Sequence, residues 1–128
     1  MNDVIIIIPT YNEFENIENI IRKIFSLNND YHLLVIDDNS PDMTSHVVKK
    51  LISEFENKLF INIREAKLGL GSAYVTGFKY ALKKGYKYII TMDADLSHNP
   101  IDISRLIQNA DNLCIGSRYI SGINVVNW

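Results

Sequence analysis

Residues 4–8 form an unbroken run of β-branched apolar side chains, one Val followed by four Ile. Successive side chains of a β-strand point to opposite faces of the sheet, so both faces of this strand must be covered. Strands of this kind are typical of parallel sheets that carry helices on both sides. The run therefore predicts an α/β fold in which this segment is an inner strand.

The rest of the chain alternates between helical and strand patterns. Further strands are expected over residues 32–38, 59–64, 86–92 and 113–116, and Pro9 is expected to end the first strand. Helices are expected from Glu13 to about Leu27, from Pro41 through Phe55, from the end of a glycine turn at residues 69–72 to about Lys84 with Gly85 as C-cap, and from about Ile101. This order predicts a mostly parallel sheet with helices on both faces.

Size and charge limit the classes of function. The 128 residues suffice for one domain, so residues 1–128 are interpreted as a single domain without repeat or linker. A formal net charge of −2 gives no electrostatic footprint for nucleic acid. The first three residues carry no basic segment, so no signal peptide is expected, and no apolar run comes near the roughly 18–20 residues of a membrane span. The single Cys114 is expected to be a buried, reduced thiol, which favours a cytoplasmic location.

Polar segments follow each of the first four predicted strands. In parallel sheets these strand ends share one edge, and ligands bind there. The sharpest signal is Asp93-Ala94-Asp95, which follows a buried strand. Two carboxylates at this spacing share a face and suit Mg²⁺ or Mn²⁺. The alternative is structural: Asp93 ends the strand and Asp95 caps the next turn.

Two other strand ends have competing interpretations. Asp37 and Asp38 favour ligand binding over helix capping, because capping does not require two preceding aspartates. The Gly69-Leu70-Gly71 turn is no dinucleotide fingerprint, because its third glycine position is occupied by Tyr74. Close packing of the following helix explains the turn at least as well as phosphate contact. Arg64 and Lys67 nearby have the charge to contact a phosphate, but the default expectation is that they are solvated at the surface.

Together these segments resemble the family 2 glycosyltransferases with the GT-A fold. Within that family they are most similar to the dolichyl- or polyprenyl-phosphate mannose synthases. The resemblance rests on residues 8–13 (IPTYNE), 36–42 (IDDNSPD), 68–74 (LGLGSAY), 92–98 (MDADLSH) and 116–119 (GSRY), in family order and spacing. There are two departures: Asn39 stands where the group usually has Gly, and Ser97 stands where some members place a metal-assisting Gln.

The resemblance implies a set of site residues. Those matching nucleotide-sugar-binding positions are Pro9, Tyr11, Glu13, Ile36, Asp38, Asp93, Ala94, Asp95 and Arg118. Asp93 and Asp95 match the metal–diphosphate motif, so Mg²⁺ or Mn²⁺ is the implied cofactor. Asp95 and Arg118 are the implied catalytic residues. Arg118 matches a basic residue that contacts a phosphate near the reaction centre.

The resemblance also implies an activity and partners. The expected reaction transfers mannose from GDP-mannose to a polyprenyl (dolichyl) phosphate with inversion. The implied setting is the cytosolic face of a membrane, with a membrane-anchoring subunit or a homo-oligomer as candidate partners. Family members continue for roughly another hundred residues, so the chain is expected to be the N-terminal, donor-binding portion of such an enzyme.

Three alternatives stay open on the sequence. The chain could bind nucleotide without turning over alone. It could belong to a family 2 transferase that uses a UDP-sugar and another acceptor. A phosphatase-like hydrolase with Asp93 as nucleophile is a third, although its motif belongs on an early strand and requires Thr or Val where Ser97 stands.

Overall fold

The computed structural model describes residues 4–28, 30–65, 69–94, 103, 116–120 and 123–127. The helices are α1 (Ile17–Leu27), α2 (Thr44–Ile52) and α3 (Leu70–Lys84). The strands are β1 (Val4–Thr10), β2 (His32–Asp37), β3 (Leu59–Ile63), β4 (Tyr88–Thr91), β5 (Gly116–Ile120) and β6 (Ile123–Asn127). None of the helices in this described part combines the length and apolar character that crossing a membrane requires.

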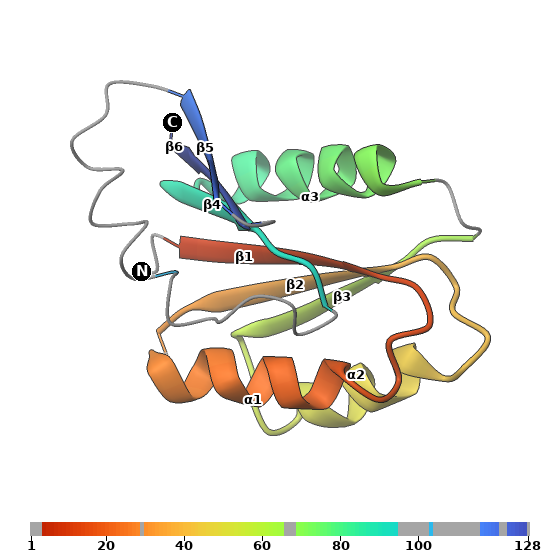
Figure 1. The fold of residues 1–128 in the computed structure, drawn as a ribbon. Coiled ribbons are helices and arrows are strands. Elements are labelled where there is room, and N and C mark those ends of the chain that lie inside the picture. Colours follow the sequence, from red (N-terminus) through yellow and green to blue (C-terminus); the bar gives the residue numbers. More distant parts are fainter. Residues whose placement is uncertain are drawn as a thin grey trace.

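One mixed sheet organises the chain, with strand order β3-β2-β1-β4-β6-β5. The first four strands in the sequence are mutually parallel, as predicted, and β1 lies between β2 and β4. The antiparallel strand β6 pairs with β4 and carries β5 on its outer side. In Figure 1, α1 and α2 cover one face of the sheet and α3 covers the other. The predicted helices on both faces are thus confirmed.

The alternation of side chains along β1 builds two separate cores. Ile6 and Ile8 point into the larger core, under α1 and α2. Ile5 and Ile7 point into the smaller core, under α3. All four are fully buried, at about 1.5–3 kcal/mol of hydrophobic stabilisation for each side chain. The double burial expected from the apolar run is confirmed.

Helix α3 packs on the sheet through small residues spaced four apart. Ala73, Gly77 and Ala81 are all buried on the face that meets β1 and β2. A Cβ placed on Gly77 would lie 2.7 Å from the Cδ1 and Cγ2 atoms of Ile7. A bare backbone at this position therefore lets the helix approach β1 closely. The glycines expected to allow close packing, Gly69 and Gly71, have no atom within 4 Å of an added Cβ. The close approach is instead at Gly77, about two helical turns further along the chain.

Several predicted boundaries are wrong. Strand β1 runs through Pro9 to Thr10, because beyond Ile7 its register continues with β2 alone and a missing N–H is tolerated on the other edge. Helices α1 and α2 begin at Ile17 and Thr44, three or four residues later than predicted. The two preceding loops are held to each other by hydrogen bonds described below.

The C-terminal part also differs from the prediction. Strand β5 begins at Gly116, where the predicted strand ended, and β6 was not predicted at all. The expected helix near Ile101 falls almost wholly outside the described residues; within it, Ile103 is helical and buried. Cys114 also lies outside them. The left-handed C-cap at Gly85 is confirmed, with a φ of 83°.

His32 and Tyr86 form a hydrogen-bonded aromatic contact at the opposite, amino edge of the sheet. The His32 ring also packs edge-on against Phe60, with ring centroids 5.6 Å apart. Burial, followed by the charge of Lys58, lowers the pKa of His32 below its ordinary value of about 6.5. Burial raises the pKa of Tyr86 to about 12, so its hydroxyl stays protonated at neutral pH.

We expect Gly77→Ala to lower the free energy of unfolding by about 1–3 kcal/mol, because the added methyl group overlaps Ile7. The matched control is Gly71→Ala on the same helix, where a Cβ meets nothing within 4 Å. That control should leave stability unchanged or raise it by up to about 1 kcal/mol. Urea unfolding measures both. Equal effects of the two substitutions would contradict the close approach at Gly77.

The depressed pKa of His32 predicts a pH-dependent stability. Between the folded-state pKa and about 6.5, the unfolded chain binds more protons, so the free energy of unfolding rises with pH across that window. Above it, this contribution is fully present. His32→Gln should flatten this part of the profile, whereas His46→Gln, at an exposed position on α2, should not. A wild-type slope that survives His32→Gln would refute the assignment.

Candidate functional site

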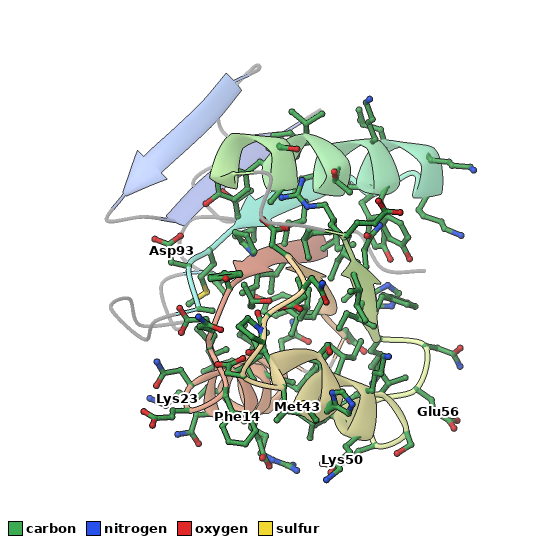
Figure 2. The ribbon with its side chains drawn as sticks, turned by 90° about the vertical axis from the view of Figure 1, so that its right-hand side faces the viewer. Phe14, Lys23, Met43, Lys50, Glu56 and Asp93 are labelled. Atoms are coloured by element: carbon green, nitrogen blue, oxygen red, sulfur yellow. The ribbon has the colours of Figure 1, made fainter. Side chains whose placement is uncertain are left out.

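The carboxyl ends of β1, β2, β3 and β4 lie at one edge of the sheet, as the parallel pairing requires. Figure 2 looks onto this edge, with Asp93 beside the end of β4 and with Phe14 and Met43 on the loops below it. Three predicted positions come from β1 and the loop after it: Pro9 is half-buried, Tyr11 is 37% exposed and Glu13 is half-buried. The sheet thus brings these residues to the same edge as Asp38 and Asp93.

Asp37 is a structural residue at the centre of this edge. Its carboxylate is fully buried and accepts hydrogen bonds from the Thr10 hydroxyl (2.7 Å), the Ser40 hydroxyl (2.6 Å) and the Ser40 backbone N–H (3.0 Å). Three donors compensate the cost of burying a charge without any ligand. Asp37 therefore ties the ends of β1 and β2 together. Of the two aspartates, Asp38 is the one that stays a candidate for binding a ligand.

Asp38 is held by a buried arginine. Arg64 Nε lies 2.6 Å from Asp38 Oδ1, and Arg64 Nη2 lies 2.8 Å from Asp38 Oδ2. The two side chains are only 7% and 9% exposed. A bidentate geometry of this kind fixes the plane of the carboxylate as well as its position. A carboxylate offers about four acceptor sites, so Asp38 can bind Arg64 and still accept from a ligand.

Arg64 also reaches the start of α3. Its Nη1 donates to the Ser72 hydroxyl at 2.6 Å, and its Nη2 donates to the Gly69 carbonyl at 3.1 Å. The expectation that Arg64 is solvated at the surface is therefore wrong. The physical reason is that β3 delivers its side chain between two loops whose acceptors take up the guanidinium donors. Sequence patterns gave no sign of this, because Arg64 and Asp38 are 26 residues apart.

The loop after β1 is attached to the loop after β2 by three consecutive backbone N–H groups. Asn12 N–H donates to Ser40 Oγ (2.9 Å), Glu13 N–H to Thr44 Oγ1 (3.1 Å) and Phe14 N–H to Asp42 Oδ2 (3.0 Å). Asp42 also accepts from the backbone N–H and the hydroxyl of Thr44 at the start of α2. The N-cap position of α2 is Met43, and the carboxylate of Asp42 before it accepts the backbone N–H of the first helical residue, Thr44; Asp37 and Asp38 do not take this role.

Asn39 adopts the left-handed conformation, with a φ of 59°. Glycine and asparagine occupy this region most readily. Asn39 stands where the sequences it resembles usually have Gly. The left-handed conformation explains why Asn can replace Gly at this position. The Asn39 side chain also donates to the Glu65 carbonyl at 3.3 Å.

Asp93 is the described part of the predicted metal motif. It is half-buried just beyond β4, and the Tyr74 hydroxyl donates to its Oδ1 at 3.4 Å. Ala94 beside it is buried. Asp95 lies outside the described residues, as do Ser97 and His98. Within the described ranges, no group of three His, Cys, Asp or Glu side chains is placed to hold a metal ion.

Two predicted residues lie away from the edge loops. The Ile36 side chain is fully buried in the core under α3, so its backbone is what remains for a ligand. Arg118 lies on β5 opposite Val125, which pairs in turn with Ile90. Its backbone is thus two strands from β4 and level with the middle of that strand.

A groove of about 670 Å³ lies between α1 and α2, away from Asp93. Its lining includes Phe14 and Met43, which are about half exposed, and Lys50. Figure 2 shows these three side chains together below the sheet edge. No residue predicted for the site lines this groove, so it is separate from the candidate site.

Removing Arg64 should leave Asp38 buried without its partner. We expect Arg64→Met to lower the free energy of unfolding by about 3–5 kcal/mol, and Arg64→Lys to lower it less. Arg22 is the matched control, because it also makes a bidentate contact with a carboxylate, that of Glu54, but at an exposed position. Urea unfolding of Arg22→Met should show only a small change. Similar losses of unfolding free energy in Arg64→Met and Arg22→Met would contradict the conclusion that the buried pair stabilises the fold more than the exposed pair does.

Comparisons with known proteins agree with this architecture. Residues 5–128 match the family described as Glycosyl transferase family 2. Polyprenol monophosphomannose synthase of Mycolicibacterium smegmatis is 42% identical over 127 residues, covering 97% of this chain and 48% of that protein. Dolichol-phosphate mannosyltransferase of Pyrococcus furiosus is 42% identical over 130 residues, covering 96% of this chain and 35% of that protein. The chain thus spans half or less of these relatives' length.

A solved structure gives the same result for the fold. Mannosyltransferase PcManGT from Pyrobaculum calidifontis, in complex with GDP-Man and Mn²⁺, aligns with a TM-score of 0.83 at 17% identity. The alignment covers 98% of this chain and 44% of that one. The fold is therefore GT-A, as predicted, and the chain belongs to glycosyltransferase family 2.

Proposed function

We propose that this chain is the donor-binding part of a mannosyltransferase that uses GDP-mannose and a polyprenyl phosphate. The observation that carries the proposal is the 42% identity, over nearly the whole chain, to a polyprenol monophosphomannose synthase. The solved neighbour in complex with GDP-Man and Mn²⁺ supports the choice of donor. The side chains gathered at the carboxyl edge of the sheet support the proposal as well.

The nucleotide is proposed to lie across the carboxyl ends of β1 and β2. The exposed ring of Tyr11 offers an apolar face to the base, and Glu13 offers a carboxylate beside it. Asp38, held in a fixed plane by Arg64, would accept hydrogen bonds from the base or ribose. Pro9 and the backbone of Ile36, paired with each other in the sheet register, would complete the floor of this subsite.

The diphosphate is proposed to lie at the end of β4. Asp93, with Asp95 two residues further, supplies the hard carboxylate oxygens that Mg²⁺ and Mn²⁺ prefer, and phosphate oxygens would complete the shell. When bound there, the cation neutralises the negative charge that develops on the departing diphosphate. Tyr74 orients the Asp93 carboxylate through its hydroxyl. Arg118 is the proposed second contact to phosphate.

The transfer needs little help from a base. A phosphate monoester has a second pKa of about 6 and is already mostly dianionic at neutral pH. Its oxygen would attack the anomeric carbon of mannose from the face opposite the leaving group. The bond from that carbon to the diphosphate oxygen breaks, GDP departs and the configuration inverts. Positioning and charge stabilisation are then the work left to the protein.

The acceptor sets the proposed location and partners. A polyprenyl phosphate is held in a membrane, so the enzyme would work at the membrane surface, on the cytosolic side. An anchoring partner subunit or a second copy would supply the membrane contact. The second candidate function is nucleotide binding without turnover, and it is favoured by the one observation that the chain spans 48% of the M. smegmatis relative.

Titration calorimetry with GDP, UDP and their sugars in the presence of Mn²⁺ tests the donor. We expect GDP and GDP-mannose to bind, and UDP to bind at least about tenfold more weakly, a difference of about 1.4 kcal/mol. Asp93→Asn should remove the Mn²⁺-dependent part of GDP binding, whereas Asp30→Asn, at an exposed turn, should not. Binding of UDP in preference to GDP would overturn the mannose proposal in favour of a UDP-sugar donor.

Transfer of radiolabelled mannose from GDP-mannose to a polyprenyl phosphate in detergent micelles tests turnover. We expect the glycolipid product, and expect Asp95→Asn to abolish it. The control is Asp30→Asn, which should leave product formation intact. GDP binding without product would instead support the nucleotide-binding function for the chain by itself.

A further inference from the structure

We propose that Ser40, Asp42 and Thr44 are positioning residues that set the affinity for the nucleotide by holding the loop after β1. The inference rests on the proposed function, because that loop carries Tyr11 and Glu13. None of the three was predicted to touch the ligand. We call the three hydrogen bonds from Asn12, Glu13 and Phe14 N–H to these side chains the loop latch.

The latch acts on the backbone of a segment at the surface. Tyr11 is 37% exposed, Phe14 is 49% exposed, and Asn12 between them is also exposed. Three successive backbone N–H groups each find a different side chain across the gap to the next loop. Hydrogen bonds at three consecutive positions fix the path of the backbone, and with it the directions of Tyr11 and Glu13.

The acceptors of the latch are themselves rigidly mounted. Thr44 is fully buried at the first residue of α2. The Ser40 hydroxyl donates to Asp37, which is in turn bound by Thr10 at the end of β1. Asp42 accepts from Thr44 as well as from the loop. The loop after β2, which carries Ser40 and Asp42, is therefore itself held by Asp37 at the end of β2 and by Thr44 at the start of α2.

Backbone conformation is the independent observation. Met43 has a left-handed φ of 71°, which costs a residue of its type roughly 1–2 kcal/mol, and Asn12 has a left-handed φ of 58°, which asparagine tolerates better. One lies inside the latched segment and the other lies between two of its acceptors. Unfavourable conformations persist only where surrounding contacts enforce them. The latch supplies such contacts: Asn12 is itself one of its donors, and Asp42 and Thr44 on either side of Met43 are two of its acceptors.

The charge of Asp42 fits this role. Partial burial raises the pKa of its carboxyl, but hydrogen bonds from the Thr44 hydroxyl and from the Phe14 and Thr44 N–H groups outweigh this and lower the pKa below its usual range. Asp42 is thus ionised at neutral pH and accepts from the loop as a charged group. Charge-assisted hydrogen bonds are the stronger kind.

Loss of the latch should weaken binding without removing any ligand contact. A loop that is not held must be ordered when the nucleotide binds, and this cost lowers the apparent affinity. We expect Ser40→Ala and Thr44→Val each to raise the Kd for GDP with Mn²⁺ about five- to tenfold. Thr44→Ser keeps the hydroxyl and should stay within about twofold of wild type.

The matched control is Ser53→Ala, because the Ser53 hydroxyl is far from the latch in the sequence and donates to the Lys50 carbonyl of the preceding helical turn. It should leave the Kd unchanged. Amide hydrogen exchange provides a second readout that does not depend on nucleotide. Asn12 and Glu13 should exchange faster in Ser40→Ala and Thr44→Val respectively, while the amides of β1 remain protected.

The outcomes separate the two proposals. Wild type that binds no nucleotide overturns the proposed function. Wild type that binds GDP while both Ser40→Ala and Thr44→Val keep its Kd overturns the latch alone. A loss of affinity in Thr44→Ser equal to that in Thr44→Val would also overturn it, because the hydroxyl would then be irrelevant. Should Thr44→Val fail to fold, Ser40→Ala and the exchange of Asn12 carry the same test.

Discussion

The double burial of β1 is the constraint on which the rest of the structure depends. Its first five residues are one Val and four Ile, so neither face tolerates water, and the strand requires helices above and below and a strand on each side. The chain meets this requirement with α1 and α2 on one face, α3 on the other, and β2 and β4 as neighbours. The fit is close enough that α3 must present Gly77 to Ile7.

This arrangement concentrates charge at the carboxyl edge, where it must be compensated. Asp37, Asp38 and Arg64 are all nearly fully buried there. Asp37 is stabilised by hydrogen bonds from hydroxyl and backbone donors, and Asp38 by the guanidinium of Arg64. The two adjacent aspartates therefore do different work: the first ties the ends of β1 and β2 together, and the second pairs with the arginine that follows β3. Their chemistry is identical, and only their partners distinguish them.

Much of the architecture was predictable because it depends on local patterns. The order of the elements, the parallel pairing of the first four strands and the placement of Tyr11, Glu13, Asp38 and Asp93 at one edge all follow from periodicity and from the rule for parallel sheets. Helix starts were predicted too early, because the loops before α1 and α2 are shaped by contacts with each other rather than by their own propensities. Strand β6 lacked a preceding helix and so fell outside the alternating pattern.

The sequence by itself determined the fold class, the family and the edge of the sheet at which the candidate site lies, because runs of apolar residues and short motifs act over a few positions. The tertiary structure decided which side chains work together there. Arg64 meets Asp38 across 26 positions, and the latch joins residues 28 to 31 apart. Such partners are set by strand register and by the distances between packed elements, and neither quantity is written in the spacing of residues along the chain.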